Sequence, residues 1–240
     1  MTAKNIAIIG SAGAIGSAFT QELAERYPEA YICAFARNTP EQLPGGVRFH
    51  CIDYTNESSI AACAAAASAA SPLDLVVVAT GILHEGEIKP EKSLRDLSAE
   101  KFQRLFAANT VAPALLAKHF VPKLNRDERA VFAALSARVG SISDNRLGGW
   151  YAYRASKAAL NMVLKNVAIE TRRQNKGAII VGLQPGTVDS ELSKPFQGNV
   201  PEGQLFTPTY AARQLLNVLD TLKPEQSGKC FDFEGLEVEP

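Results

Sequence analysis

Short apolar runs alternate with longer amphipathic segments along almost the whole chain. Strand-like runs occur at residues 5–9, 30–35, 47–51, 73–79, 130–135, 178–183 and 229–233. Helical patterns lie between them at 14–26, 57–70, 98–108, 110–124, 151–174 and 208–222. Runs such as LVVVAT are apolar at consecutive positions, as a strand covered by helices on both faces must be. The alternation predicts an α/β fold: a doubly wound parallel sheet of the Rossmann type, with about seven strands and helices on both faces.

Composition excludes several classes of protein. The chain has 240 residues, 46% of them hydrophobic, and no Pro/Gly-rich linker divides it, so we expect one domain over 1–240. Lys plus Arg and Asp plus Glu are equal at 25 each, without a basic stripe that would favour nucleic acid. The four cysteines have no metal spacing and are expected to be small buried hydrophobes. With no secretory signal and no membrane-length apolar stretch, a cytoplasmic location is expected.

The segment YAYRASKAAL holds the strongest candidate chemistry, because Tyr153 and Lys157 are four residues apart. In a helix these positions share one face, so an ammonium lies beside a phenol. A free tyrosine titrates near ~10, and two unit charges ~4 Å apart interact by about 4 kcal/mol at an effective dielectric of ~20. We therefore expect Lys157 to lower the pKa of Tyr153 toward neutral pH, where the phenol can exchange protons. The alternative is a pair that merely lines a solvated helix.

A glycine-rich turn follows the first expected strand. Gly10, Gly13 and Gly16 lie in GSAGAIGSAF, which opens the first helix. Such a turn lets backbone N–H groups approach a pyrophosphate at a helix N-terminus; a tight packing corner is the alternative. After the second strand, Ala36 and Arg37 stand where a NAD site usually has an acid. A guanidinium suits a 2′-phosphate, so we expect NADP(H) in preference to NAD(H), unless Arg37 is only a solvated loop residue.

Two polar segments interrupt the alternation of strands and helices. Residues 82–97 and 187–207 carry Pro and Gly, and each follows an expected strand. Ligands of open α/β sheets bind outside the carboxyl ends of the strands. Both segments are therefore candidate walls of a substrate site, with 187–207 as the expected substrate loop; ordinary surface connections are the alternative.

Together these motifs resemble the short-chain dehydrogenase/reductases, and within them the C-factor-like, carbonyl-reductase-like group. The resemblance covers nearly the whole chain, and its motifs follow one another in the family's order: the glycine turn, Ala79-Thr80-Gly81, Asn109 in AANTVAP, the YxxxK of Tyr153 and Lys157, and Pro185-Gly186 with Val188. It implies an oxidoreductase that transfers a hydride between NADP(H) and a small carbonyl or alcohol substrate. Tyr153 would be the general acid/base, Lys157 would bind the nicotinamide ribose, and Asn109 would hold a water linked to solvent.

The resemblance also implies which residues contact the dinucleotide. These are Gly10, Ser11, Ala14, Ile15, Gly16, Arg37, Asp53, Tyr54, Ala79, Thr80, Gly81, Tyr153, Lys157, Pro185, Gly186 and Val188. The family uses the helix that begins near Tyr153 for subunit contacts, and small residues such as Ala155 and Ala158 permit close packing there. A homodimer or homotetramer is therefore expected.

Three positions depart from the family pattern. Ala14 replaces the middle glycine, and Asn-Ala-Gly becomes Ala-Thr-Gly at 79–81. The carbonyl-polarising serine, counted back from Gly140, falls on Ala137. We expect Ser136 or Ser141 to take over its role, with Ser143 a looser candidate, because losing one such donor typically costs about 10²–10³ in rate. The alternative is a dinucleotide-binding sensor or signalling protein with little turnover.

The remaining candidate side chains are given structural roles. His50, His84 and His119 are scattered, and all three are interpreted as structural or surface residues. Trp150, three residues before Tyr153, is either a wall of the site or a buried anchor. Arg154 is expected to be solvated.

Overall fold

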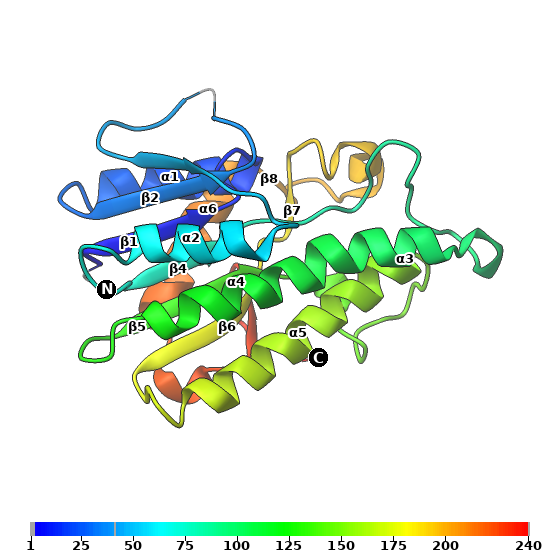
Figure 1. Cartoon of the computed structure of the whole chain (residues 1–240). Helices are drawn as coiled ribbons and strands as arrows, with labels where there is room; N and C mark the ends of the chain where they lie inside the picture. Colours follow the sequence, from blue (N-terminus) through cyan, green and yellow to red (C-terminus); the bar gives the residue numbers. More distant parts are fainter. Residues whose placement is uncertain (1–2, 41, 240) are drawn as a thin grey trace.

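One parallel sheet forms the centre of the structure, a computed structural model that describes residues 3–40 and 42–239 (Figure 1). Residues 1, 2, 41 and 240 of the expected 1–240 domain lie outside the described residues. The strands pair in the order β3-β2-β1-β4-β5-β6-β9, and every pair is parallel. They are β1 Asn5–Ile9, β2 Tyr31–Ala36, β3 Arg48–Cys51, β4 Leu75–Val78, β5 Ala130–Leu135, β6 Ala178–Gln184 and β9 Cys230–Asp232. The predicted fold class is confirmed.

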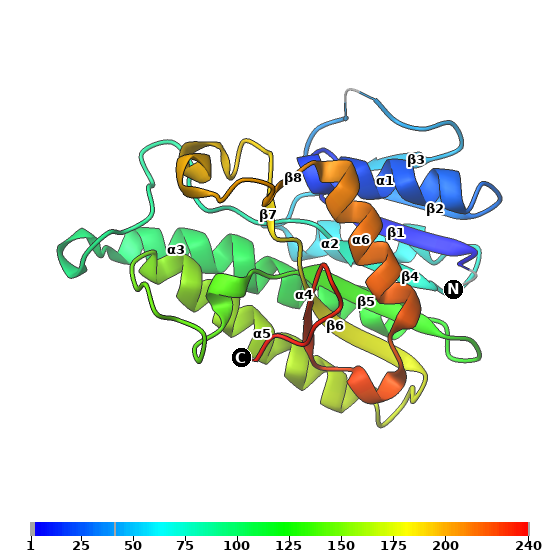
Figure 2. The ribbon, with the colours of Figure 1, turned by 180° about the vertical axis from the view of Figure 1, so that it is seen from behind.

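Helices cover both faces of this sheet (Figures 1 and 2). Alternate side chains of a strand point to opposite faces, so Ile6 and Ile8 belong to one buried core and Ala7 and Ile9 to the other. Two helices cover the Ile6 face and three cover the opposite face. On the Ile6 face they are α1 Ala14–Arg26 and α6 Pro208–Thr221; on the other they are α2 Glu57–Ala67, α4 Ala112–Phe120 and α5 Tyr151–Thr171.

Local features refine the predicted elements. The expected helices at 98–108 and 110–124 form one path, in which α3 (Ala99–Phe106) joins α4 through a π-helical turn, Ala107–Val111. The two-residue strands β7 (Thr187–Val188) and β8 (Leu205–Phe206) pair with each other. They were not predicted, because two residues are too short to show alternation.

One cysteine differs from the expectation. Cys33, Cys63 and Cys230 are buried, as predicted, but Cys51 is exposed. Cys51 lies on β3, the outermost strand of the sheet, whose side chains are only partly covered. The prediction that it is a buried hydrophobe is therefore wrong.

The carboxyl ends of all the strands share one edge of the sheet, which lies on the right in Figure 1. The order of the strands reverses beside β1, since β2 flanks it on one side and β4 on the other. Ligands of doubly wound sheets bind at such a switch point. The 82–97 and 187–207 segments leave the sheet at this same edge (Figure 1).

Candidate functional site

Tyr153 and Lys157 lie in the first turns of α5, and both are buried. Tyr153 is 8% exposed and Lys157 is 3% exposed. The Lys157 Nζ lies 5.9 Å from the centroid of the Tyr153 ring. It donates a 2.9 Å hydrogen bond to the carbonyl oxygen of Leu135, the last residue of β5. This face of the helix is therefore turned to the carboxyl edge of the sheet.

Burial controls the protonation of this pair. It raises the pKa of Tyr153 to about 12 and lowers the pKa of Lys157 to about 8. In both cases the loss of water disfavours the charged form. The prediction that Lys157 lowers the pKa of Tyr153 toward neutral pH is thus wrong for the chain alone. The Lys157 ammonium instead donates its hydrogen bond to the Leu135 carbonyl oxygen.

Asn109 connects the segment after β4 to α5. It lies in the π-helical turn and is fully buried. Its Oδ1 accepts a 2.8 Å hydrogen bond from the Ile82 N–H, and its Nδ2 donates to the Ile82 carbonyl and the Ser156 hydroxyl at 2.9 and 3.1 Å. A Cβ atom at Gly81 would lie 3.3 Å from both the Asn109 Oδ1 and the Lys157 Nζ. The structure thus brings Asn109, Gly81 and Lys157 together.

The glycine turn requires glycine at two of its three positions. Gly10 has a φ of 92°, and a Cβ atom there would lie 2.8 Å from the carbonyl oxygen of Ala79. A Cβ atom at Gly16 would collide with the carbonyl oxygen of Gly10, whereas one at Gly13 would meet that oxygen only at 3.4 Å. Helix α1 follows at Ala14 and Ile15, and no described side chain caps its first N–H groups. An anion can accept hydrogen bonds from these groups.

Three hydroxyls around this turn are buried without a hydrogen-bond partner among the described residues. They are the Ser11 Oγ, the Tyr54 Oη and the Thr80 Oγ1. Burial raises the pKa of Tyr54 to about 12, while Arg37 and the backbone of Gly10 act in the opposite direction. An unpaired buried polar group costs about 1–3 kcal/mol. The phosphates and ribose hydroxyls of a dinucleotide would supply the missing partners, so these residues fit that ligand.

Two predicted adenosine contacts differ in their surroundings. Arg37 follows β2 directly and is exposed, so its guanidinium is open to a ligand. Asp53 is also exposed, but its Oδ1 accepts hydrogen bonds from the N–H and the hydroxyl of Thr55 at 2.8 and 2.7 Å. These bonds hold the pKa of Asp53 below its ordinary value. Asp53 thus has a local role in the turn before α2.

The expected nicotinamide end of the site lies after β6. Gly186 has a φ of 72°, and a Cβ atom there would lie 2.7 Å from the Phe206 ring. Val188 is buried in β7, whose pairing with β8 brings Phe206 over Gly186. Glycine after Pro185 is therefore required by both its backbone conformation and this close contact.

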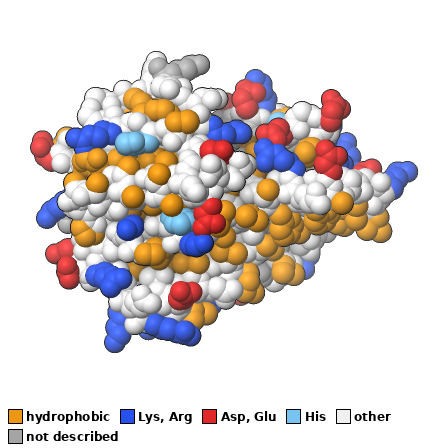
Figure 3. Space-filling model, viewed as in Figure 1, with side chains coloured by type: hydrophobic (Ala, Val, Ile, Leu, Met, Phe, Trp, Pro, Cys, Tyr) orange, Lys and Arg blue, Asp and Glu red, His pale blue; other side chains and the backbone are white. Residues whose placement is uncertain are grey.

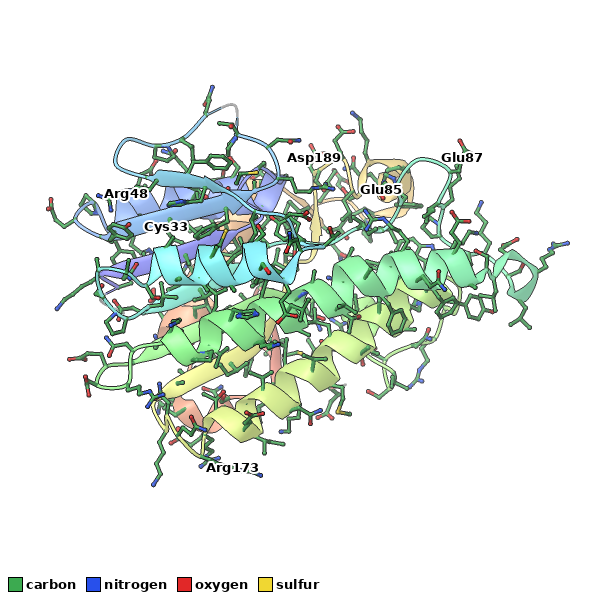
Figure 4. All side chains as sticks on the ribbon, viewed as in Figure 1. Cys33, Arg48, Glu85, Glu87, Arg173 and Asp189 are labelled. Atoms are coloured by element: carbon green, nitrogen blue, oxygen red, sulfur yellow. The ribbon has the colours of Figure 1, made fainter. Side chains whose placement is uncertain are left out.

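Aromatic side chains from separate segments meet above Tyr153. The Trp150 ring centroid lies 6.3 Å from that of Tyr153 and 5.0 Å from that of Phe196, which itself lies 5.9 Å from His84. The His84 Nε2 is 3.2 Å from the carbonyl oxygens of both Glu191 and Leu192. The 82–97 and 187–207 segments therefore meet over Tyr153; Glu85 and Asp189 mark them in Figure 4. Trp150 is half-buried and is one of the side chains that pack around Tyr153.

Sequence reasoning missed Phe196 and the bridging role of His84. Each stands in a polar loop outside any motif, and their only signal was the position of the loops after strands. His50 stacks on Phe35 and His119 pairs with Glu57, in line with structural roles. In the described part of the chain, no cluster of three or more His, Cys, Asp or Glu side chains could hold a metal ion. Nor does any helix there have the length and apolar character of a membrane span.

Comparison with known proteins identifies the family. The model of the short chain dehydrogenase family matches residues 4–200. This chain belongs to that family. It is 34% identical to the C-signal of Myxococcus xanthus over 146 residues, 61% of this chain and 82% of that protein. It is 31% identical to the 1-hydroxy-2-glutathionyl-2-methyl-3-butene dehydrogenase of Rhodococcus sp. (strain AD45) over 234 residues, 97% of each.

The fold has close structural relatives. The NADPH-bound carbonyl reductase from chicken fatty liver superimposes with a TM-score of 0.84 over 100% of both chains, at 24% identity. The carbonyl reductase Sniffer of D. melanogaster gives the same TM-score over 99% of each chain, at 21% identity. At these identities the likeness establishes the fold alone. The predicted family and its C-factor-like and carbonyl-reductase-like relatives are confirmed.

The position of the family's serine is occupied by a methyl group. Ala137 packs against the apolar cluster that contains Tyr153. The Ser136 hydroxyl instead donates a 2.6 Å hydrogen bond to the Asn161 Oδ1, two helical turns beyond Tyr153. The Ser141 hydroxyl accepts from the Asp144 N–H at 3.1 Å and lies 3.3 Å from that of Ser143. This geometry gives no support to the expected substitution by Ser136 or Ser141.

The glycine turn yields a matched pair of substitutions. We expect Gly16→Ala to weaken NADPH binding by at least about tenfold, or about 1.4 kcal/mol, because its methyl would displace the Gly10 carbonyl and the turn around it. Gly13→Ala should bind within about twofold of the unchanged protein, since its methyl makes an ordinary contact. NADPH fluorescence titration measures both. Equal losses in the two variants would show that this turn does not form the dinucleotide site.

Proposed function

We propose that this chain is an NADP(H)-dependent reductase of carbonyl compounds, in which Tyr153 is the general acid/base. The observation that carries the proposal is the meeting of Tyr153, Lys157 and Asn109 beside Gly81. They lie at the sheet edge that also carries the uncapped glycine turn. Membership of an oxidoreductase family, and the NADPH bound to the chicken liver carbonyl reductase, support the same assignment.

The chain's own residues prepare a proton donor. A phenol with a pKa of about 12 is protonated at neutral pH, which is the state that a donor to a carbonyl oxygen requires. Lys157, with a pKa of about 8, is charged below that pH and would bind the hydroxyls of the nicotinamide ribose. The bound dinucleotide supplies the hydride. Gly10, Gly16 and the helix start between them would hold its pyrophosphate.

The surroundings of Tyr153 favour an apolar substrate. Leu83, Val139, Trp150 and Phe196 belong to the cluster that packs around it. A pocket of such side chains favours a carbonyl carried on an apolar or aromatic group, since apolar contact area drives binding. The 82–97 and 187–207 segments are the proposed walls of this pocket.

We also propose a homodimer or homotetramer formed through α4 and α5. Hydrophobic side chains gather along these helices in Figure 3. Met162 and Ile169 on α5 and Val111, at the end of the π-helical turn that leads into α4, are half or more exposed. Burying these side chains between two copies would remove an apolar patch from water.

Replacement of the phenol tests the proposed chemistry. Tyr153→Phe should reduce turnover of NADPH with a panel of aromatic aldehydes and ketones by more than about 10³-fold, because the proton donor is lost. NADPH affinity should stay within about twofold, since the ring remains. Tyr151→Phe, in the same helical turn, is the control and should keep its rate.

Two outcomes contradict the proposal in different ways. A Tyr153→Phe variant that keeps its rate would remove Tyr153 from the chemistry. Tight NADPH binding by the unchanged protein with no reduction across the panel would favour the sensor function. The absent serine and the similarity to the C-signal of Myxococcus xanthus are the observations that support a sensor.

The choice of dinucleotide is tested at Arg37. Arg37→Ala should weaken NADPH binding by about tenfold or more, because the exposed guanidinium is the proposed partner of the 2′-phosphate. The affinity for NADH, which lacks that phosphate, should change by less than about twofold. Isothermal titration of both dinucleotides gives the comparison. Equal losses for the two would place Arg37 elsewhere in the site.

Restoring the family's serine should improve catalysis. Ala137→Ser places a hydroxyl on the strand end that packs against the Tyr153 cluster. One donor to a developing oxyanion is typically worth about 10²–10³ in rate, so kcat should rise by about tenfold or more. Ser136→Ala, which removes only the bond to Asn161, should leave kcat within about twofold. A lower kcat in Ala137→Ser would show that the site polarises the carbonyl by another group.

A further inference from the structure

The backbone of Trp150 is in a conformation that side chains rarely adopt. Its φ and ψ are 51° and 42°, in the left-handed region, and no other non-glycine residue of the described chain has a positive φ. This conformation costs an L-residue roughly 1–2 kcal/mol. Trp150 is also the residue before the first turn of α5, and its own side chain does not cap that helix. Other contacts must therefore hold it in place.

Glu91, from the 82–97 segment, makes those contacts. Its carbonyl oxygen accepts a 2.6 Å hydrogen bond from the Trp150 N–H, and its Oε2 accepts one of 3.3 Å from the Ala152 N–H. A carboxylate is favoured at a helix N-terminus by the helix dipole. The Arg154 Nε supports the same turn by donating a 3.1 Å hydrogen bond to the Gly149 carbonyl. The prediction that Arg154 is solvated is wrong, since it is half-buried in this contact.

The carboxylate is held at a high energetic cost. Glu91 is only 2% exposed, and its Oε1 has no hydrogen-bond partner among the described residues. None of the described Lys or Arg side chains forms an ion pair with it. Asp96, in the same segment, accepts bonds from the Lys92 and Ser93 N–H groups and is only partly buried. A serine or aspartate at the N-cap would satisfy a helix start more cheaply than a buried glutamate.

The consequence of this contact is the position of an aromatic ring. Trp150 packs between Tyr153 and Phe196, with ring centroids 6.3 and 5.0 Å away. We propose that Glu91 is a positioning residue: its side chain anchors the first turn of α5 through the Ala152 N–H, next to the left-handed Trp150, and so fixes the ring that forms the substrate-facing wall beside Tyr153. The orientation of this wall toward a substrate rests on the proposed function. The role of Glu91 in fixing the position of the Trp150 ring does not rest on it.

Trp150 is the only tryptophan of the chain, so its fluorescence reports this position directly. In Glu91→Ala we expect a red-shifted emission, because the ring leaves its packed place, and a KM for the carbonyl substrate raised by about tenfold or more. kcat and NADPH affinity should stay within about threefold. Glu91→Gln keeps an oxygen acceptor for the Ala152 N–H and should lie near the unchanged protein. Asp96→Asn is the matched control and should change neither emission nor KM.

The outcomes separate this proposal from the proposed function. If the unchanged protein reduces no carbonyl, the emission of Glu91→Ala against Asp96→Asn still tests the positioning. Unchanged emission and unchanged KM in Glu91→Ala would overturn it. A loss of NADPH affinity as large as the rise in KM would also overturn it, because it would indicate a general structural role. If Glu91→Ala does not fold, it is combined in one protein with Trp150→Gly, which relieves the strained backbone at position 150. Folding should then be restored, and failure of the double variant to fold would overturn the proposal.

Discussion

The exclusion of water from Tyr153 and Lys157 is the interaction on which the rest of the site depends. Both side chains lie on one face of α5, against the end of β5 and beneath two loops. Burial here shifts both groups toward their uncharged forms: the phenol keeps its proton at neutral pH, and the amine loses its proton at a lower pH than a lysine in water. A protonated phenol therefore lies at this edge of the sheet at neutral pH, and a phenolate there would need stabilisation from its surroundings.

The fold supplies those surroundings at one edge of the sheet. Parallel strands bring the glycine turn after β1, the Gly81 segment after β4 and the Ala137 segment after β5 to the same side. Asn109 joins the Gly81 segment to α5 through its hydrogen bonds to Ile82 and Ser156. The buried hydroxyls without partners cluster there as well. Buried polar groups without a partner in the protein are tolerated where a ligand supplies the missing hydrogen bonds.

Much of this arrangement could be predicted from the sequence. The strands β1 and β5 and the helix α1 have the predicted limits, because buried parallel strands are apolar at every position. The Tyr153–Lys157 spacing and the glycine turn also place their residues correctly, since helical periodicity and steric limits on a turn are local properties.

The rest depends on tertiary contacts that no local pattern encodes. The expected acidity of Tyr153 was wrong because it counted the charge of Lys157 but not the burial of both groups. Ser136 turns to Asn161, a partner supplied by packing of β5 on α5. Phe196, His84 and Glu91 matter only because separate loops meet over α5. The strand pair β7–β8 was too short to recognise.

Burial sets the protonation of Tyr153 and Lys157, and the titration of Lys157 is the sharpest way to examine this. An NMR titration of the lysine ε-methylene groups, with Lys157→Arg used to assign the signal, follows its charge. We expect Lys157 to lose its proton with a midpoint near its pKa of about 8. A midpoint at or above the ordinary lysine value of ~10.4 would contradict this expectation, because burial would then not have lowered the pKa of Lys157.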